Sequence, residues 1–300
     1  MPARPIRVDV DSQGLCLEEG LLRQRLARLP AKAPVVVMIH GFRFAPDVAG
    51  HCPHHHILGM SQVPGDRTAV SWPLHLHLDG TAGIGIGLGW HARGSLFGAL
   101  ARADAAGLAL ADLAATIRAI DPWRRVDVIA HSLGARVALA ALRQATPGDF
   151  GRLILLAAAE TRGPAQAALF SPAGRAAEVI NITSRENDLF DFIVEWATVL
   201  GADTALGQGL GMATPGWLDL QIDQPKTEAA LAALGLPLRA RASRICHWSP
   251  YVRPGVFALY RALFQRRLSL GALRAAMPAE LDRRWSRLVW PAVPGPLMPA

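Results

Sequence analysis

Continuous apolar runs alternate along this chain with stretches whose apolar residues recur at helical spacing. The clearest runs are VVVMIH at 35–40, RVDVIAH at 125–131 and RLILLAAA at 152–159. Runs of this kind are typical of strands that are covered on both faces, as in a parallel sheet. Their alternation with helical patterns predicts βαβ units. The expected fold class is therefore α/β, with a mostly parallel central sheet and helices on both faces.

Weaker patterns add further elements to this expectation. Strands are also expected in a hairpin at 5–17 and at about 68–72, 83–90, 178–184 and 243–248, and helices at 18–29, 95–119, 133–144 and 256–264. Residues 189–242 mix helical and glycine-rich stretches. Because no repeat or linker divides the chain, we expect a single domain over 1–300, with 189–242 as a cap or insertion.

The composition excludes several classes of protein. With 51% hydrophobic and 18% charged residues, the chain is neither a disordered segment nor a coiled coil. The net charge of +7 would suit a nucleic-acid partner, but Lys occurs only at positions 32 and 226 and the arginines are scattered. No stacking aromatics are interleaved with the basic residues. No nucleic-acid partner is therefore predicted.

The cysteines, the hydropathy and a histidine tract indicate the compartment of the protein and whether it binds a metal. The three cysteines are widely spaced and form no CxxC motif, which favours a reducing compartment and a cytoplasmic protein. No apolar run approaches the roughly 18 residues of a transmembrane helix, so no membrane span is expected. The histidine tract at 51–56 offers nitrogen and sulfur ligands for zinc, but Pro53 interrupts it. We expect no bound metal and no organic cofactor.

A nucleophile motif lies where the run at 125–131 meets the following helix. Ser132 is the centre of AHSLG, with Ala130 and Gly134 two positions to either side. Small residues are needed at both positions because the strand and helix backbones come very close. Such a turn holds the serine in a strained conformation and exposes its Oγ at the carboxyl edge of the sheet. We therefore expect Ser132 to be a catalytic nucleophile.

A serine hydroxyl needs a base at neutral pH, and His247 is the candidate. It ends the strand expected at 243–248, just before a helix, where a base could reach Ser132 across the sheet edge. The base in turn needs an acid that holds its tautomer. Asp188 follows the strand expected at 178–184 and lies between serine and histidine in chain order. The order alone does not choose the loop, so three other carboxylates remain alternatives: Glu160, Glu186 and Asp191.

Acyl transfer also needs two N–H donors aimed at the developing oxyanion. Leu133, the residue after the nucleophile, supplies one donor by geometry. The loop after the first central strand supplies the other in this arrangement, and here it reads His40-Gly41-Phe42-Arg43. The expected oxyanion hole is formed by the N–H groups of Phe42 and Leu133.

Together these motifs resemble the α/β-hydrolase superfamily. HGF at 40–42, AHSLG at 130–134, Asp188 and His247 carry the resemblance, which corresponds to about residues 34–264. The wider pattern is similar to bacterial serine-hydrolase-like proteins of undefined substrate. The sequence departs from the superfamily's pattern at Ala130, which replaces glycine, and in a long Gly- and His-rich stretch at 50–95.

The resemblance implies a serine hydrolase that acts on carboxylic esters, with Ser132, His247 and Asp188 as the triad. A thioesterase, an amidase or a non-catalytic interaction protein would have the same motifs. The expected partner is a small-molecule ester with an apolar acyl group, because LFDFIVEWATVL at 189–200 is rich in apolar residues that could line a pocket. The candidate pocket residues are His131, Phe190, Trp196 and Trp248.

Overall fold

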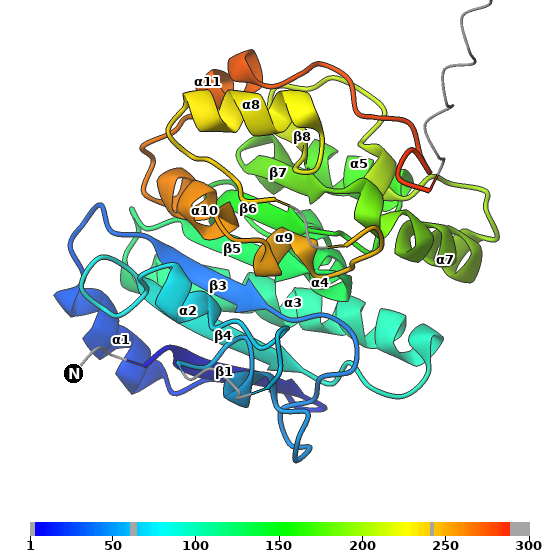
Figure 1. The fold of residues 1–300 in the computed structure, drawn as a ribbon. Helices are drawn as coiled ribbons and strands as arrows, with labels where there is room; N and C mark the ends of the chain where they lie inside the picture. The colour runs from blue at the N-terminus through cyan, green and yellow to red at the C-terminus, as the bar shows by residue number, and fades with distance from the viewer. Residues whose placement is uncertain (1–3, 61–64, 241–242, 289–300) are drawn as a thin grey trace, which may run out of the picture.

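A computed structural model describes residues 4–60, 65–240 and 243–288, and its core is one eight-stranded sheet (Figure 1). The strand order is β2-β1-β4-β3-β5-β6-β7-β8, and β1 and β2 are the antiparallel pair in an otherwise parallel sheet. The strands are β1 (Ile6–Asp11), β2 (Gly14–Cys16), β3 (Val35–Ile39), β4 (Ile84–Trp90), β5 (Val126–His131), β6 (Phe150–Leu156), β7 (Glu178–Thr183) and β8 (Trp217–Gln221).

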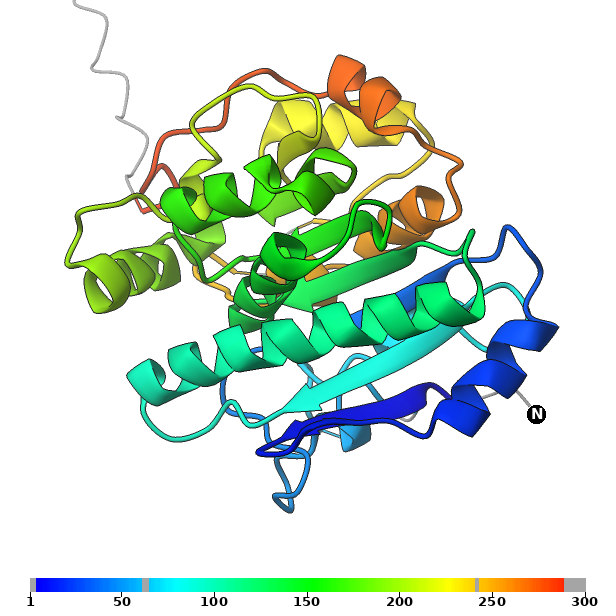
Figure 2. The same cartoon turned by 180° about the vertical axis from the view of Figure 1, so that it is seen from behind.

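Helices cover both faces of this sheet, which confirms the expected fold class (Figures 1 and 2). One face carries α1 (Glu19–Arg28), α3 (Leu96–Ile120), α4 (Leu133–Gln144), α5 (Arg162–Phe170) and α6 (Pro172–Arg175). The other carries α2 (Trp72–His75), α8 (Pro225–Ala233), α9 (Ser249–Val252), α10 (Val256–Phe264) and α11 (Leu270–Ala276). The helix α7 (Asp188–Val199) lies at the carboxyl side of the sheet, and short 3-10 turns are η1 (Pro53–His55), η2 (Arg185–Asn187) and η3 (Leu206–Gln208).

The continuous apolar runs form a core on each side of the sheet, because successive side chains of a strand point to opposite faces. In β3, Val35 and Val37 join the cluster under α3 and α4, whereas Val36 and Met38 join the cluster under α9 and α10. All five residues of β3 are buried. A strand of this kind has no polar face, which is why its sequence shows no alternation.

Two strands expected from the sequence are wrong. Residues 68–72 form a turn leading into α2, because the Ser71 hydroxyl accepts a hydrogen bond from the Leu74 N–H at the start of the helix and Pro73 occupies its first turn. Residues 243–248 form an irregular loop before α9. The edge strand beyond β7 is instead β8, which lies within the range expected as a cap or insertion and belongs to the sheet.

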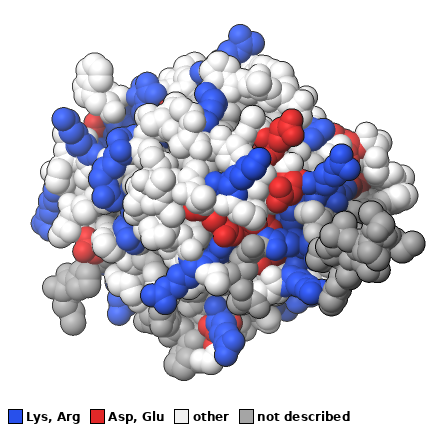
Figure 3. Space-filling view, turned by 45° about the horizontal axis from the view of Figure 1, so that its top comes forward, with Lys and Arg blue, Asp and Glu red and all other residues white. Residues whose placement is uncertain are grey.

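Basic side chains are spread over the molecular surface rather than gathered on one patch, at least on the face shown in Figure 3. Acidic side chains lie among them on the same face. Several arginines are used in ion pairs within the fold, such as Arg152 with Glu178 and Arg266 with Asp127. The positive net charge therefore does not form a continuous basic surface on this side of the molecule.

Candidate active site

The turn between β5 and α4 has the geometry of a nucleophile elbow. Ser132 has φ 55° and ψ −123°, a conformation that L-residues rarely adopt. Strain of this kind costs on the order of 1–3 kcal/mol and persists only where the surroundings impose it. Here the Ser132 N–H donates to the Leu156 carbonyl at 2.9 Å, and the Ser132 carbonyl accepts from the Ala159 N–H at 3.1 Å. The end of β6 and the loop that follows it thus hold the turn from both sides.

Two glycines let neighbouring backbone approach this serine. A Cβ on Gly134 would lie 2.7 Å from the His40 carbonyl oxygen, and a Cβ on Gly41 would lie 2.8 Å from the Cβ of Ser132. Both distances are shorter than non-bonded atoms tolerate. The loop after β3 therefore lies directly against Ser132 only because residue 41 has no side chain.

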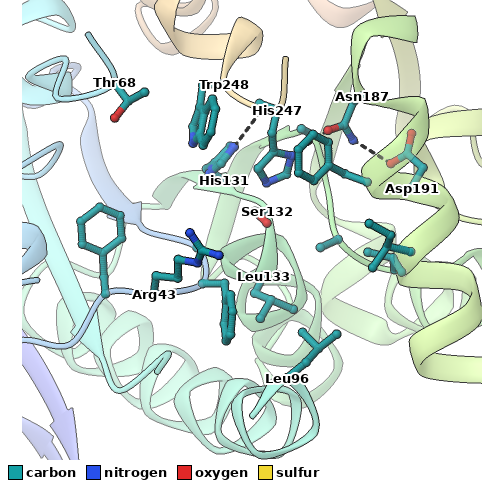
Figure 4. A pocket seen from close by; sticks show the side chains of 18 of the residues that line it. Arg43, Thr68, Leu96, His131, Ser132, Leu133, Asn187, Asp191, His247 and Trp248 are labelled. Atoms are coloured by element: carbon teal, nitrogen blue, oxygen red, sulfur yellow. Dashed lines mark hydrogen bonds between the residues drawn. The ribbon is translucent and has the colours of Figure 1, made fainter. Parts of the chain in front are cut away.

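His247 lies over Ser132 and lines the same cavity (Figure 4). Its loop is held by the Cys246 N–H, which donates to the Glu186 carbonyl at 2.9 Å, and by His131, whose Nε2 lies 3.1 Å from the His247 carbonyl oxygen. The Ser249 hydroxyl also donates to the Glu186 carboxylate. No hydrogen bond joins the Ser132 hydroxyl to the His247 ring among the described residues, and such catalytic contacts often tighten only when substrate binds.

The partner of His247 is Asn187, and not the expected Asp188. His247 Nδ1 lies 2.6 Å from Asn187 Oδ1, so Nδ1–H donates and Nε2 is left free to face the serine. The Asn187 amide donates in turn to Asp191 Oδ1 at 2.8 Å, and this contact fixes which end of the amide faces the ring (Figure 4). The Asp188 carboxylate points elsewhere, toward Arg185 at 3.1 Å and the Trp285 N–H at 2.6 Å.

A 3-10 turn explains why Asn187, rather than Asp188, contacts the His247 ring. The turn η2 covers Arg185–Asn187 and leads straight into α7. Because it advances by about three residues per turn, neighbouring side chains leave the axis roughly 120° apart. Asn187 therefore faces His247 while Asp188 faces into the protein. In the sequence, Asn187 and Asp191 are four residues apart at the start of a helix, but this spacing alone does not choose Asn187 over Asp188.

The other two carboxylates considered for the triad are engaged in contacts of their own. Glu160 is buried in an ion pair with Arg136 at 3.1 Å and accepts the Thr161 N–H at 3.0 Å. Glu186 binds the Ser249 hydroxyl. Burial raises the pKa of both carboxyl groups. Neither contacts the His247 ring.

Two backbone N–H groups at the site are without a partner. Neither Phe42 nor Leu133 donates its N–H to any described residue. The Leu133 N–H begins α4, where the first amides of a helix have no partner within it. Arg43 N–H, the next along the loop, is taken by the Ala92 carbonyl at 2.9 Å. Both residues line the cavity, and their N–H groups have no acceptor among the described residues.

The cavity has a volume of about 490 Å³, which suits a small-molecule ligand. Of the expected pocket residues, His131, Phe190 and Trp248 line it. Trp196 does not: it lies on the outer side of α7 with 53% of its surface exposed, and it packs against Phe192. The apolar lining comes instead from the side chains Leu96, Leu100, Leu133, Ile193 and Val194.

Burial controls the protonation of the histidines. Loss of surrounding water lowers the pKa of His247 well below the ordinary 6.5, and the neighbouring His131 lowers it further. The same desolvation lowers the pKa of His131 to about 4. Both rings are therefore neutral at pH 7. Burial acts in the opposite direction on Asp191 and raises its pKa to about 7.

The histidine tract at 51–56 is engaged in structural contacts rather than in a cluster of ligands. His54 pairs with Asp9 at 2.7 Å, and His56 pairs with Asp66 at 2.9 Å. Within the part of the chain that the structure describes, no three His, Cys, Asp or Glu side chains are grouped so that they could hold a metal ion. In the same residues no helix is long and apolar enough to cross a membrane.

The sheet and the elbow are those of the α/β-hydrolase fold. A family model described as an alpha/beta hydrolase of unknown function (DUF900) matches residues 18–157, which include the loop at 40–43 and Ser132. The chain therefore has the α/β-hydrolase fold, and its residues 18–157 resemble this family. The match ends before Asn187 and His247, so the assignment of these two residues rests on the structure.

No curated protein matches the sequence. Among solved structures, the lipase BlEst2 of Bacillus licheniformis, crystallised in its propeptide form, is similar with a TM-score of 0.40 and 12% identity. The match covers 78% of this chain and 50% of that lipase, so the present chain spans about half of the lipase's length.

Proposed function

We propose that the protein is a serine hydrolase that cleaves carboxylic esters through an acyl-enzyme. Ser132 is the nucleophile and His247 is the general base. Asn187 takes the place expected for Asp188 and holds the tautomer of His247, with Asp191 behind it. Phe42 and Leu133 supply the oxyanion hole. The observation that carries the proposal is a strained serine facing a histidine whose Nδ1 is already bound, at 2.6 Å, to Asn187.

The geometry accounts for each step of acyl transfer. As the Ser132 Oγ attacks the ester carbonyl, His247 Nε2 takes its proton, because Nδ1 carries the other proton and is held by Asn187. The carbonyl oxygen becomes an oxyanion, which the two free N–H groups stabilise. His247 then returns the proton to the departing alcohol, and a water molecule releases the acyl group by the same route. An amide in place of a carboxylate has precedent in Cys-His-Asn sites.

The apolar part of the cavity indicates where the acyl group lies. Leu133 and Leu96 lie on one side of Ser132, below it in Figure 4, and Ile193 and Val194 of α7 extend the lining. Burial of an apolar chain there would release roughly 0.8 kcal/mol per methylene. We therefore propose an acyl chain of moderate length, bound beside α7.

A substrate panel tests the proposed reaction. We expect the purified protein to hydrolyse p-nitrophenyl butyrate and hexanoate faster than the acetate, because the longer chains bury more apolar surface in the cavity. Thioesters and anilides of the same acids should react more slowly than the esters. A higher kcat/KM for the thioester or anilide would assign a thioesterase or an amidase. Absence of Ser132-dependent turnover of every substrate would favour a binding protein with this fold.

The pH profile of the same reaction tests the assignment of the base. Because His247 acts as a base only when neutral, and burial lowers its pKa, kcat/KM should stay high as the pH falls through 6.5 and decline only below it. An inflection near pH 7 that disappears in Asp191→Asn would report the Asp191 carboxyl group. An inflection at 6.5 or above that persists in Asp191→Asn would contradict the assignment.

A further inference from the structure

Arg43 lines the cavity beside Ser132 and has no ion-pair partner among the residues that the structure describes. Its exposed side chain lines the cavity and extends toward Ser132 (Figure 4). The guanidinium makes no hydrogen bond or ion pair with any residue that the structure describes. Arginines with buried or half-buried side chains elsewhere form ion pairs, for example Arg136 with Glu160 and Arg253 with Glu228. A free guanidinium in a ligand cavity offers five N–H donors to an anion.

The backbone at this residue is strained. Arg43 has φ 77°, a left-handed conformation that costs an L-residue and that glycine would adopt freely. Two hydrogen bonds with Ala92, in the loop after β4, impose this conformation. The Arg43 N–H donates to the Ala92 carbonyl, and the Ala92 N–H donates to the Phe44 carbonyl, each at 2.9 Å. The local fold therefore favours glycine at this position, and the arginine side chain is not explained by backbone geometry or by packing.

The lining around Arg43 is more polar than the lining beside α7. His56 and Thr68 also line the cavity, and His56 Nδ1 is buried without a hydrogen-bond partner. The carboxylate that these two residues contact, Asp66, already accepts from His56, from the Thr68 hydroxyl and from the Thr68 N–H. Three of its roughly four acceptor sites are thus used within its own loop.

The only carboxyl group among the described lining residues is Asp191, which is engaged by Asn187. In Figure 4 it lies on the other side of Ser132 from Arg43. No lining carboxylate is therefore placed to neutralise Arg43, and the surplus positive charge beside the nucleophile is available to a ligand.

We propose that Arg43 binds an anionic group of the substrate, so that the natural substrate is an ester carrying a carboxylate or a phosphate. This inference rests on the proposed esterase function and names its substrate class. The apolar chain lies beside α7, the scissile carbonyl lies at Ser132, and the anion pairs with the guanidinium. This departs from the expectation of a purely apolar substrate.

Three chromogenic esters test the proposal. p-Nitrophenyl butyrate is neutral, mono-p-nitrophenyl glutarate carries a carboxylate on the acyl side, and 3-carboxy-4-nitrophenyl butyrate carries one on the alcohol side. In the wild-type protein we expect at least one anionic ester to exceed the neutral one in kcat/KM, corrected for leaving-group reactivity. In Arg43→Gln that selectivity ratio should fall by about 10- to 100-fold, the usual effect of losing a charge-assisted hydrogen bond. Higher salt should reduce the wild-type ratio as well.

Matched variants separate charge from structure. Arg43→Lys keeps the charge and should retain part of the selectivity, whereas Arg43→Gly removes both the charge and the strain and should lose it while folding normally. Arg28→Gln removes the same charge from the exposed end of α1, before β3 begins, and should leave the ratio unchanged. These variants keep the test informative even where one substitution disturbs the loop.

The outcomes distinguish this inference from the proposed function. If Ser132-dependent hydrolysis of the neutral ester is present but the ratio is unchanged in both Arg43→Gln and Arg43→Gly, Arg43 is not an anion site and the esterase assignment stands. An equal drop in Arg28→Gln would also overturn the inference, because the effect would then belong to net charge. If no ester is hydrolysed in a Ser132-dependent manner, the proposed function itself fails.

Discussion

Replacement of Ser132 with alanine is expected to lower kcat/KM for p-nitrophenyl butyrate by about 10³-fold or more, since the nucleophile is lost while the oxyanion donors remain. Alanine keeps the Cβ and therefore the same backbone strain at φ 55°, so the substitution removes little besides the hydroxyl oxygen. Thermal unfolding should change little. The measurement is a steady-state assay of purified protein whose folding has been checked by circular dichroism.

A second serine provides the matched control for that variant. Ser269 caps α11, accepting a hydrogen bond from the Ala272 N–H at 3.1 Å, and does not line the cavity. Ser269→Ala should cost about 1 kcal/mol of stability and leave kcat/KM unchanged. Retention of most activity in Ser132→Ala would remove the serine from the mechanism.

Asn187→Ala is expected to have the next largest effect, a loss of about 10²- to 10³-fold in kcat. Without Asn187 Oδ1, nothing at the site holds the proton on His247 Nδ1, and the ring is free to take the tautomer that cannot accept the serine's proton. KM should change less than kcat, because the amide orients the base rather than the substrate. The same neutral ester provides the measurement.

The decisive comparison is with Asp188→Asn. This variant removes the carboxylate that the sequence favoured but leaves Asn187 in place. It should lose stability, since the buried Arg185 loses its ion pair at 3.1 Å, while kcat stays within a few-fold of wild type. If folded Asp188→Asn loses as much activity as Asn187→Ala, the carboxylate and not the amide orients His247.

The sequence predicted the centre of the fold because local and tertiary preferences agree there. The β5 run and the small residues around Ser132 predicted both a buried strand and a tight turn, and the structure has both. The elbow could be placed from sequence because its steric demand is local: the Cβ that Gly134 lacks would meet the His40 carbonyl at 2.7 Å.

The sequence alone could not show whether Asn187 or Asp188 contacts His247. Asn187 and Asp188 are adjacent, and only the 3-10 turn that precedes α7 decides which side chain faces the histidine. A carboxylate is the commoner partner, so chemistry alone favoured Asp188, whose side chain does not contact the His247 ring in the structure. The buried Arg185, which draws Asp188 away from the site, is also a tertiary contact without a local signal.

The missed strand β8 shows the same limit at the sheet edge. Its polar Asp219 reads as a surface residue, but the carboxylate accepts hydrogen bonds from Asn181, from the Trp217 indole and from the Leu210 N–H. These partners satisfy the partly buried carboxylate, and one of them, Asn181, lies 38 residues away in the sequence. A hydrophobic pattern therefore underestimates a strand whose buried polar group is satisfied by tertiary partners.

Labelling of the folded protein with a fluorophosphonate probe, followed by peptide mapping, tests the central claim most directly. The probe reacts with a serine that an adjacent base activates, so it needs no knowledge of the natural substrate. The account predicts one adduct, on Ser132, that is absent in Ser132→Ala, much reduced in Asn187→Ala, and lost when the wild-type protein is unfolded in urea before labelling. Folded protein that remains unlabelled at Ser132 would contradict it.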